Sequence, residues 1–247
     1  LGRAPGKDNI NSELIKLGGK PLHREIHKLI VNIWKEEKMP KEWQTGQIIT
    51  IHKKGNQQEC QNYRGITLLS TVYKVLSTII QRRLQEAAEN KIGQYQCGFR
   101  KGKSTIDAIY ILKQIMEKAN EANINLEILF VDFKQAFDSI KRNQLLEILK
   151  MLQVPLKLRK LIKMTMSHTR ASVKTQIGET EEFETNKGVR QGDGLSTTLF
   201  NMAIEYITRK MNKGTLRNRG GQIVAYADDV VIMAKRRDIL TQMVEEL

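Results

Sequence analysis

The sequence Tyr226-Ala227-Asp228-Asp229 stands between two apolar runs, 223–225 and 230–233. β-Favouring residues on both sides of a short polar stretch are typical of a tight hairpin, so this stretch predicts a turn that carries two neighbouring carboxylates. Asp is depleted in strands, and like charges held side by side repel each other. A divalent cation would offset that repulsion. An ordinary solvated turn is the alternative interpretation of the two aspartates alone.

A third carboxylate favours the metal interpretation. The apolar run 128–131 is followed directly by Asp132. This pattern predicts a buried strand that ends in an acid where it leaves the core. Beside the hairpin, Asp132 would complete a cluster of three carboxylates, and oxygen ligands of this kind suit two Mg²⁺ ions. Because a long stretch of chain separates Asp132 from Asp228, only tertiary structure can join them.

The composition indicates a polyanionic partner. The 247 residues include 41 Lys and Arg against 27 Asp and Glu, a net charge of +14. Nucleic acid is the leading candidate, and an anionic membrane surface is the alternative. The sequence contains no apolar run of about 18 residues and no N-terminal signal pattern, which predicts neither membrane insertion nor secretion. Two cysteines, Cys60 and Cys97, are too few for a disulfide framework, so a reducing compartment is expected.

Hydrophobic periodicity predicts interleaved helices and strands within one large or two small domains. A final hairpin and a β-ribbon argue against a purely parallel sheet. Helices are expected over 11–38, broken by Gly18-Gly19 and Pro21, and over 70–89, 104–122, 143–152, 155–167, 195–212 and 237–247; strands are expected over 47–52 and 128–132, and a ribbon over 171–185.

Two histidines in the first predicted helix, His23 and His27, lie four residues apart and could ligate a metal. No third ligand accompanies them, so ordinary surface histidines are the favoured interpretation.

Three loops carry residues suited to phosphate. The segment 188–196 places glycines, which allow a ligand to approach the backbone, directly before a predicted helix, although such a loop often marks only a sharp turn. After Asp132 the chain turns and exposes backbone N–H groups that could receive a triphosphate. Phe137 is there either a ring beside a sugar or a core aromatic that starts the next helix. Lys53 and Arg64 flank a polar loop and could bind phosphates, although basic loop residues are mostly solvated.

Together these segments resemble the reverse transcriptase domain of non-LTR, LINE-type retrotransposons. The resemblance covers nearly the whole chain in the order of the family. The segments that carry it are Ala4–Ile10 as the N-terminal signature, Asn62–Leu68 and Cys97–Thr105 as fingers segments, and Phe130–Asp138, Arg190–Ser196 and Tyr226–Asp229 as palm motifs.

The resemblance implies an α+β fold, with the fingers and palm of a right-hand polymerase and an antiparallel palm sheet with packed helices. It implies that residues 1–125 are mainly fingers with an N-terminal helical extension. Residues 126–247 would be mainly palm and carry the catalytic aspartates, and the two parts interleave. The sequence ends before the family's later palm motif and thumb, so we expect a chain truncated before the thumb.

The resemblance also assigns roles to individual residues. Asp132, Asp228 and Asp229 are the implied catalytic residues and ligands of two Mg²⁺ ions, with Mn²⁺ as an alternative metal. Asp229 is the least direct ligand, and the backbone carbonyl of Phe133 assists. Phe137 stands where the family has the ring that excludes a ribose 2′-OH. The nucleotide-binding residues implied are Lys53, Arg64, Gln135, Ala136, Phe137, Gln191 and Gly192.

The expected activity is that of an RNA-directed DNA polymerase, a nucleotidyltransferase that extends a primer 3′-OH on an RNA template. Its expected partners are an RNA template, a DNA primer and deoxynucleoside triphosphates, with no membrane; protein partners are not indicated. The alternative is a catalytically inactive, nucleic-acid-binding remnant of such an element. RNA-directed RNA synthesis is disfavoured by Phe137. Integration at chromosomal DNA, typical of the family, implies an intracellular protein that acts in the nucleus.

Overall fold

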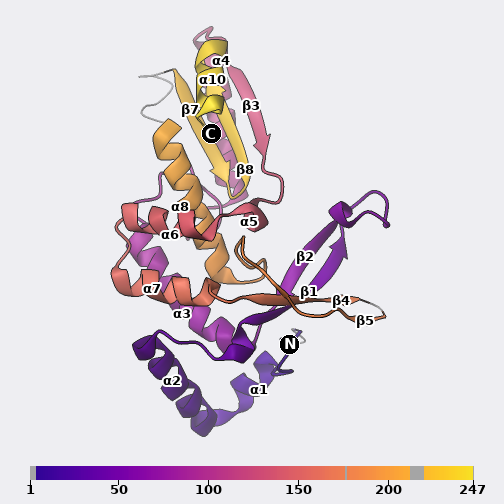
Figure 1. Cartoon of the computed structure of the whole chain (residues 1–247). Helices are drawn as coiled ribbons and strands as arrows, with labels where there is room; N and C mark the ends of the chain where they lie inside the picture. The colour runs from indigo at the N-terminus through magenta and orange to yellow at the C-terminus, as the bar shows by residue number, and fades with distance from the viewer. Residues whose placement is uncertain (1–3, 176, 212–219, 247) are drawn as a thin grey trace. The chain divides into compact units, whose positions relative to one another are not determined.

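The computed structural model describes residues 4–175, 177–211 and 220–246 of the chain (Figure 1). Contacts divide the chain into two compact units. Unit 1 comprises residues 1–86 and 137–196, and unit 2 comprises residues 87–136 and 197–247. The units are defined by contacts and not by function, so the predicted division into fingers before 125 and palm after it stays a prediction.

Unit 1 contains a mixed sheet. Strand β1 (Thr45–His52) pairs antiparallel with β2 (Tyr63–Leu68) and parallel with β4 (Arg170–Thr175). The short strands β5 (Gly178–Glu179) and β6 (Phe183–Glu184) both pair antiparallel with β4, as the predicted ribbon requires. The sequence did not predict β2, because its polar and glycine residues interrupt the apolar pattern.

The helices of unit 1 follow the predicted pattern. The predicted break falls at Gly18, between α1 and α2, and Gly19 has a φ of +67°, which glycine adopts without strain. The break predicted at Pro21 is wrong, because Pro21 lies in the first turn of α2, where a helix tolerates proline. Leu149 of α6 and Leu161 of α7 are fully buried, as the periodicity requires. The elements are α1 (Ser12–Leu17), α2 (Gly19–Glu36), the 3₁₀ turns η1 (Lys41–Trp43) and η2 (Cys60–Asn62), α3 (Thr71–Ala88, which continues into unit 2), α6 (Arg142–Met151) and α7 (Leu156–Met166).

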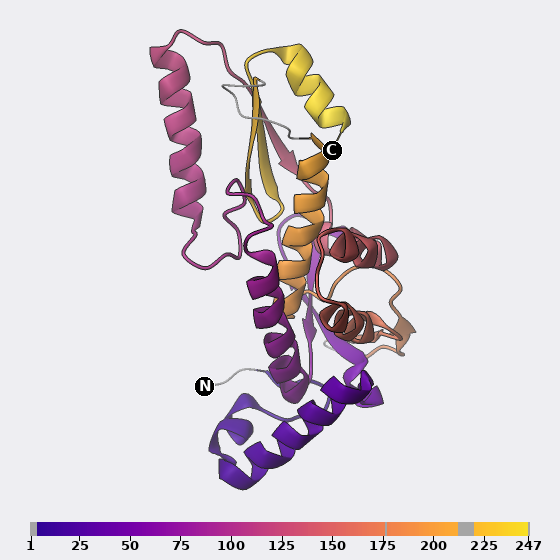
Figure 2. The same ribbon diagram turned by 90° about the vertical axis from the view of Figure 1, so that its left-hand side faces the viewer.

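Unit 2 is built on a three-stranded antiparallel sheet in the order β3-β8-β7. Its strands are β3 (Glu127–Asp132), β7 (Gly221–Tyr226) and β8 (Asp229–Ala234). Figure 2 shows α4 (Thr105–Glu121) and α10 (Arg237–Glu245) on opposite sides of this sheet. Two further helices contain a boundary between the units in sequence: α5 (Ala136–Ser139) and α8 (Gly194–Met211).

The core of unit 2 lies between the sheet and α10. Ile223, Val230 and Ile232 are buried in it together with Met243 of α10. Helix α4 begins with a capping box, in which the side chains of Ser104 and Asp107 each accept the other's backbone N–H. Both features bear out the predicted hairpin and helices. The helix ends predicted at 212 and 247 lie outside the described residues.

The expectation of a buried strand at 128–132 is wrong in one respect. Among the described strands, β3 pairs only with β8, so it is an edge strand, and its residues are half-buried or exposed. The side chain of Phe130 is 70% exposed. A continuous apolar run therefore does not distinguish a central strand from an edge strand here.

No helix within the described residues has the length and apolar character needed to cross a membrane.

The core position of Ile232 yields a stability prediction. Ile232 is 0% exposed. We expect Ile232→Ala to lower the free energy of unfolding by about 2–5 kcal/mol, because it removes buried methyl groups and leaves a cavity. Urea denaturation followed by circular dichroism measures this change. Ile106→Ala is the matched control: Ile106 is 74% exposed on α4, so its loss should cost under about 0.5 kcal/mol. Equal costs would contradict the assignment of the core.

Candidate active site

The β7–β8 hairpin turns through two residues. Tyr226 pairs with Asp229, so Ala227 and Asp228 form the turn. Ala227 has a φ of +57°, whereas Asp228 is not among the residues with positive φ. Positive φ at the first turn position alone is typical of a type II′ turn, where glycine is the usual residue. An alanine in this position is strained.

The sheet register brings the third aspartate to the same end of the sheet. Asp132, the last residue of β3, lies directly opposite Asp229, the first residue of β8. Residues directly opposite in an antiparallel pair have Cα atoms about 4.5–5.5 Å apart and side chains on one face. Two carboxylates in this relation repel each other, so the structure supplies the charge arrangement that a cation would stabilise.

Asp132 and Asp229 are exposed, and Asp228 is half-buried. Across the described parts of the chain, no three His, Cys, Asp or Glu side chains form a group that could hold a metal ion. The backbone therefore brings the three aspartates to one end of the sheet, while their side chains do not converge. Their predicted roles as metal ligands stay predictions.

The chain after β3 carries the next predicted residues. The half-buried ring of Phe133 packs against the core cluster of unit 2. Gln135 is exposed with a φ of +53°, and Ala136, the first residue of α5, is buried. The sharp change of direction predicted after Asp132 is therefore present. It falls where the chain passes from unit 2, ending at Ala136, to unit 1, beginning at Phe137.

The remaining predicted nucleotide-binding residues belong to unit 1. Lys53 follows β1, and its N–H donates to the carbonyl of Asn62 at 2.8 Å, which closes the β1–β2 loop. Arg64 lies on β2 opposite Ile51, and both basic side chains are exposed. Phe137 is half-buried, so it is neither a fully buried core residue nor a free surface ring.

The glycine-rich loop lies against β2. The carbonyl of Gln191 accepts the N–H of Thr67 at 2.7 Å, and the Gln191 side chain donates to Oδ2 of Asp138 at 2.9 Å. Gly192 has a φ of +114°, and a Cβ there would lie 2.5 Å from the carbonyl oxygen of Thr67. Only glycine fits this close approach. Burial raises the pKa of Asp138, while the Gln191 hydrogen bond and the charge of Lys53 oppose that rise.

A buried tyrosine that the sequence did not indicate anchors the same loop. The Tyr73 hydroxyl donates to Oδ2 of Asp193 at 2.6 Å, and Oδ1 of Asp193 accepts the N–H of Leu195 at the start of α8 at 3.0 Å. The Arg190 guanidinium lies over the Tyr73 ring, 5.4 Å from its centre, and donates to the carbonyls of Trp43 and Gln44. Burial raises the pKa of Tyr73, so it stays a neutral donor. Nothing in the sequence around Tyr73 distinguishes a tyrosine that anchors a distant loop from any other tyrosine of a helix.

Arg142 holds the chain just before the loop. Its guanidinium donates to the carbonyls of Met166, Thr185 and Gly188 at 2.6–2.8 Å. Burial, followed by the charge of Arg190, lowers the pKa of Arg142. The loop is therefore held by hydrogen bonds from several elements of unit 1.

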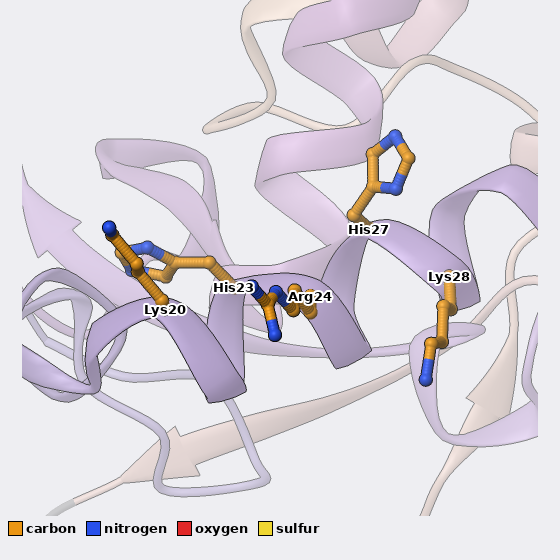
Figure 3. A pocket seen from close by; sticks show the side chains of 5 residues that line it. All are labelled: Lys20, His23, Arg24, His27 and Lys28. Atoms are coloured by element: carbon orange, nitrogen blue, oxygen red, sulfur yellow. The ribbon is translucent and has the colours of Figure 1, made fainter.

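The histidines of α2 line a shallow pocket (Figure 3). Lys20, Arg24 and Lys28 lie beside His23 and His27, and all five side chains are exposed. A ring nitrogen of His23 lies 2.7 Å from the carbonyl oxygen of Ile15. The pocket is a basic helix face without an acidic or thiol ligand among its lining residues, in agreement with surface histidines.

Residues 51–247 match the family model described as reverse transcriptase (RNA-dependent DNA polymerase). The chain belongs to the reverse transcriptase family. Enzymes of this family generally use divalent metal ions. The predicted resemblance to the non-LTR retrotransposon enzymes is confirmed by the relatives of the chain, which are named as polymerases of such elements.

The chain is 26% identical over 238 residues to the probable RNA-directed DNA polymerase from transposon BS of Drosophila melanogaster, covering 94% of the chain and 26% of that relative. It is 26% identical over 246 residues to the RNA-directed DNA polymerase from mobile element jockey of the same species, covering 97% of the chain and 26% of that relative. The chain thus spans about a quarter of the length of these relatives.

Solved structures show the same fold. Telomerase from Candida albicans, in complex with a telomeric RNA fragment, superposes with a TM-score of 0.60 at 14% identity, covering 91% of this chain and 43% of telomerase. Apo telomerase from Candida tropicalis gives a TM-score of 0.61 at 13% identity, and the match covers 92% of this chain and 46% of that telomerase. The predicted α+β polymerase fold is therefore confirmed.

The buried tyrosine of the loop yields a second prediction. We expect Tyr73→Phe to lower the free energy of unfolding by about 1–3 kcal/mol, because it removes a hydrogen bond from the buried carboxylate of Asp193. Tyr110→Phe is the control, since Tyr110 is 61% exposed. Thermal and urea unfolding measure both changes, and a Tyr73→Phe variant as stable as the control would contradict the anchoring role.

Proposed function

We propose that the chain is the RNA-directed DNA polymerase domain of a non-LTR retrotransposon and extends a primer 3′-OH on an RNA template. One observation carries the proposal. In a chain of the reverse transcriptase family, the sheet register sets Asp132 opposite Asp229, next to Asp228 at the hairpin turn.

Unit 2 supplies the metal-binding part of this function. The proposed ligands are the carboxylates of Asp132, Asp228 and Asp229 and the carbonyl of Phe133, all hard oxygen donors of the kind that Mg²⁺ prefers. Two Mg²⁺ ions, when bound, neutralise charge on the attacking and leaving oxygens of nucleotidyl transfer. The aspartates would hold and orient these ions, and Phe133, whose ring packs against the core cluster of unit 2, keeps the backbone after β3 in place.

Unit 1 supplies the proposed contacts to the nucleotide and template. It carries 26 Lys and Arg against 15 Asp and Glu, whereas unit 2 carries 15 against 12, so unit 1 holds most of the positive charge. Lys53 and Arg64 would bind phosphates of a deoxynucleoside triphosphate, and Phe137 would exclude a ribose 2′-OH. Gln191 and Gly192, held against β2, would line the nucleotide and template. At the end of unit 2, Gln135 and Ala136 would offer backbone N–H groups to the triphosphate.

A catalytically inactive remnant that only binds RNA is the second candidate. Salt-dependent RNA binding without extension under any divalent metal would select it. The presence of all three aspartates favours the polymerase.

The metal assignment is tested by Asp228→Ala. We expect primer extension on an RNA template to fall by at least about 10³-fold, because metal-ion stabilisation of the transition state contributes several kcal/mol. Asp238→Ala is the control, since Asp238 is an exposed aspartate of unit 2 paired with Arg236. Equal extension by wild type and Asp228→Ala would refute the assignment.

The sugar-selecting role is tested separately by Phe137→Ala. Removing the ring should raise the efficiency of ribonucleotide incorporation relative to deoxynucleotide incorporation by roughly 10- to 200-fold. Phe183→Ala, a partly exposed phenylalanine of β6, is the control and should leave the ratio unchanged. An unchanged ratio in Phe137→Ala would remove this role but leave the metal assignment intact.

The expected intracellular, nuclear site of action is also a proposal, and it rests on family resemblance. Imaging of a tagged protein tests it, and exclusion of the protein from the nucleus during retrotransposition would contradict it.

A further inference from the structure

The hairpin turn holds a backbone conformation that is costly for alanine. Ala227 has a φ of +57°, and its side chain is 3% exposed. A non-glycine residue in this region costs about 1–3 kcal/mol and persists only when its surroundings hold it. Because Asp228 is the next residue, the conformation of Ala227 sets the direction in which the Asp228 carboxylate leaves the turn.

One buried side chain bonds both polar backbone groups of Ala227. Oε1 of Gln96 accepts the N–H of Ala227 at 3.0 Å and the N–H of Gly98 at 2.8 Å. Nε2 of Gln96 donates to the carbonyl of Ala227 at 3.5 Å, a longer and weaker bond. Gln96 is 0% exposed, so water does not replace these partners. The Gln96 amide thus bonds the N–H and the carbonyl of Ala227, as the backbone of a neighbouring strand does in a sheet.

The segment that carries Gln96 is fixed against β7. Its backbone pairs with Ala225: the Cys97 N–H donates to the Ala225 carbonyl at 2.8 Å, and the Ala225 N–H donates to the Tyr95 carbonyl at 2.9 Å. Gly98 lies so close to the turn that a Cβ there would be 2.2 Å from the Ala227 nitrogen. The Gln96 amide therefore has little freedom to move away from Ala227.

We propose that Gln96 is a positioning residue of the polymerase, which holds Ala227 in its positive-φ conformation and thereby fixes the Asp228 carboxylate for metal binding. This inference rests on the proposed function. The role requires a donor and an acceptor on one side chain of this length. Asn is one methylene shorter, and Met matches the size without polar atoms. Glu lacks the donor and would add negative charge near two aspartates.

The test is a Mn²⁺ titration of the 247-residue chain, followed by electron paramagnetic resonance. Wild type should bind Mn²⁺, and Asp228→Asn should abolish this binding. Gln96→Met should weaken the affinity about tenfold, the equivalent of about 1.4 kcal/mol, close to the loss of a buried hydrogen bond. Gln96→Asn, which keeps a buried amide, is the second variant and should weaken binding similarly. Circular dichroism checks that each variant is folded.

Glu205→Gln is the matched control. The Glu205 carboxylate is buried and accepts the N–H of Gly93 at 2.8 Å and the hydroxyl of Tyr95 at 2.7 Å, so it holds the other end of the same segment. Its substitution should lower the unfolding temperature but leave Mn²⁺ affinity within twofold of wild type. If Gln96 had only a structural role, Gln96→Met and Glu205→Gln would have the same effect on Mn²⁺ affinity.

A rescue experiment addresses the mechanism directly. Glycine adopts positive φ without strain, so Ala227→Gly in the Gln96→Met background should recover most of the lost Mn²⁺ affinity.

In primer extension, Gln96→Met should lower kcat by about 10²-fold and leave the KM for the deoxynucleotide within twofold, because misplacement of a catalytic group by about 1 Å costs that much.

The outcomes separate the inference from the proposed function. If wild type shows no Mn²⁺ binding that depends on Asp228, the metal assignment fails and the inference fails with it. If wild type binds as expected and the folded Gln96 variants bind equally well, only the role of Gln96 is overturned. Loss of affinity in the Gln96 variants and in Glu205→Gln alike also overturns it.

Discussion

The antiparallel register of β3, β8 and β7 is the constraint on which the candidate active site depends. A shift of one residue would turn every side chain of a strand to the opposite face and move Asp132 away from Asp229. The register is specified by Ile223, Val230 and Ile232, which must face the core beneath α10. Apolar burial therefore holds two carboxylates opposite each other, although their charges repel. A divalent cation would offset this repulsion, as the proposed function requires.

The glycine-rich loop of unit 1 is held by polar contacts instead. Tyr73 bonds Asp193, and Thr67 bonds the backbone of Gln191. Arg142 bonds the carbonyls of Met166, Thr185 and Gly188. These buried hydrogen bonds specify the conformation of the loop together with the buried side chains of Val189 and Leu195. Hydrogen bonds thus hold the loop of unit 1 in place, whereas sheet packing holds the aspartates of unit 2 in register.

Much of the architecture could be predicted from periodicity. The helices, the break at Gly18, the ribbon and the final hairpin follow from apolar spacing and from glycine, both local properties. The residues missed were those whose role depends on a distant partner. Strand β2 forms because β1 pairs with it, and the exposure of Phe130 follows from the position of β3 at the sheet edge. Nothing near Gln96 in sequence indicates that it bonds Ala227.

The sequence by itself determined the family and the fold class and singled out the three aspartates as candidates, because motifs and hydrophobic patterns depend on local residue order. Only the tertiary structure decided which groups meet. It set Asp132 opposite Asp229, held the loop at Gln191 against β2 and enclosed Gln96 beside Ala227. The physical reason is that pairing registers and buried hydrogen bonds join residues far apart in the chain. Their geometry results from packing of whole elements and not from the spacing of residues within one.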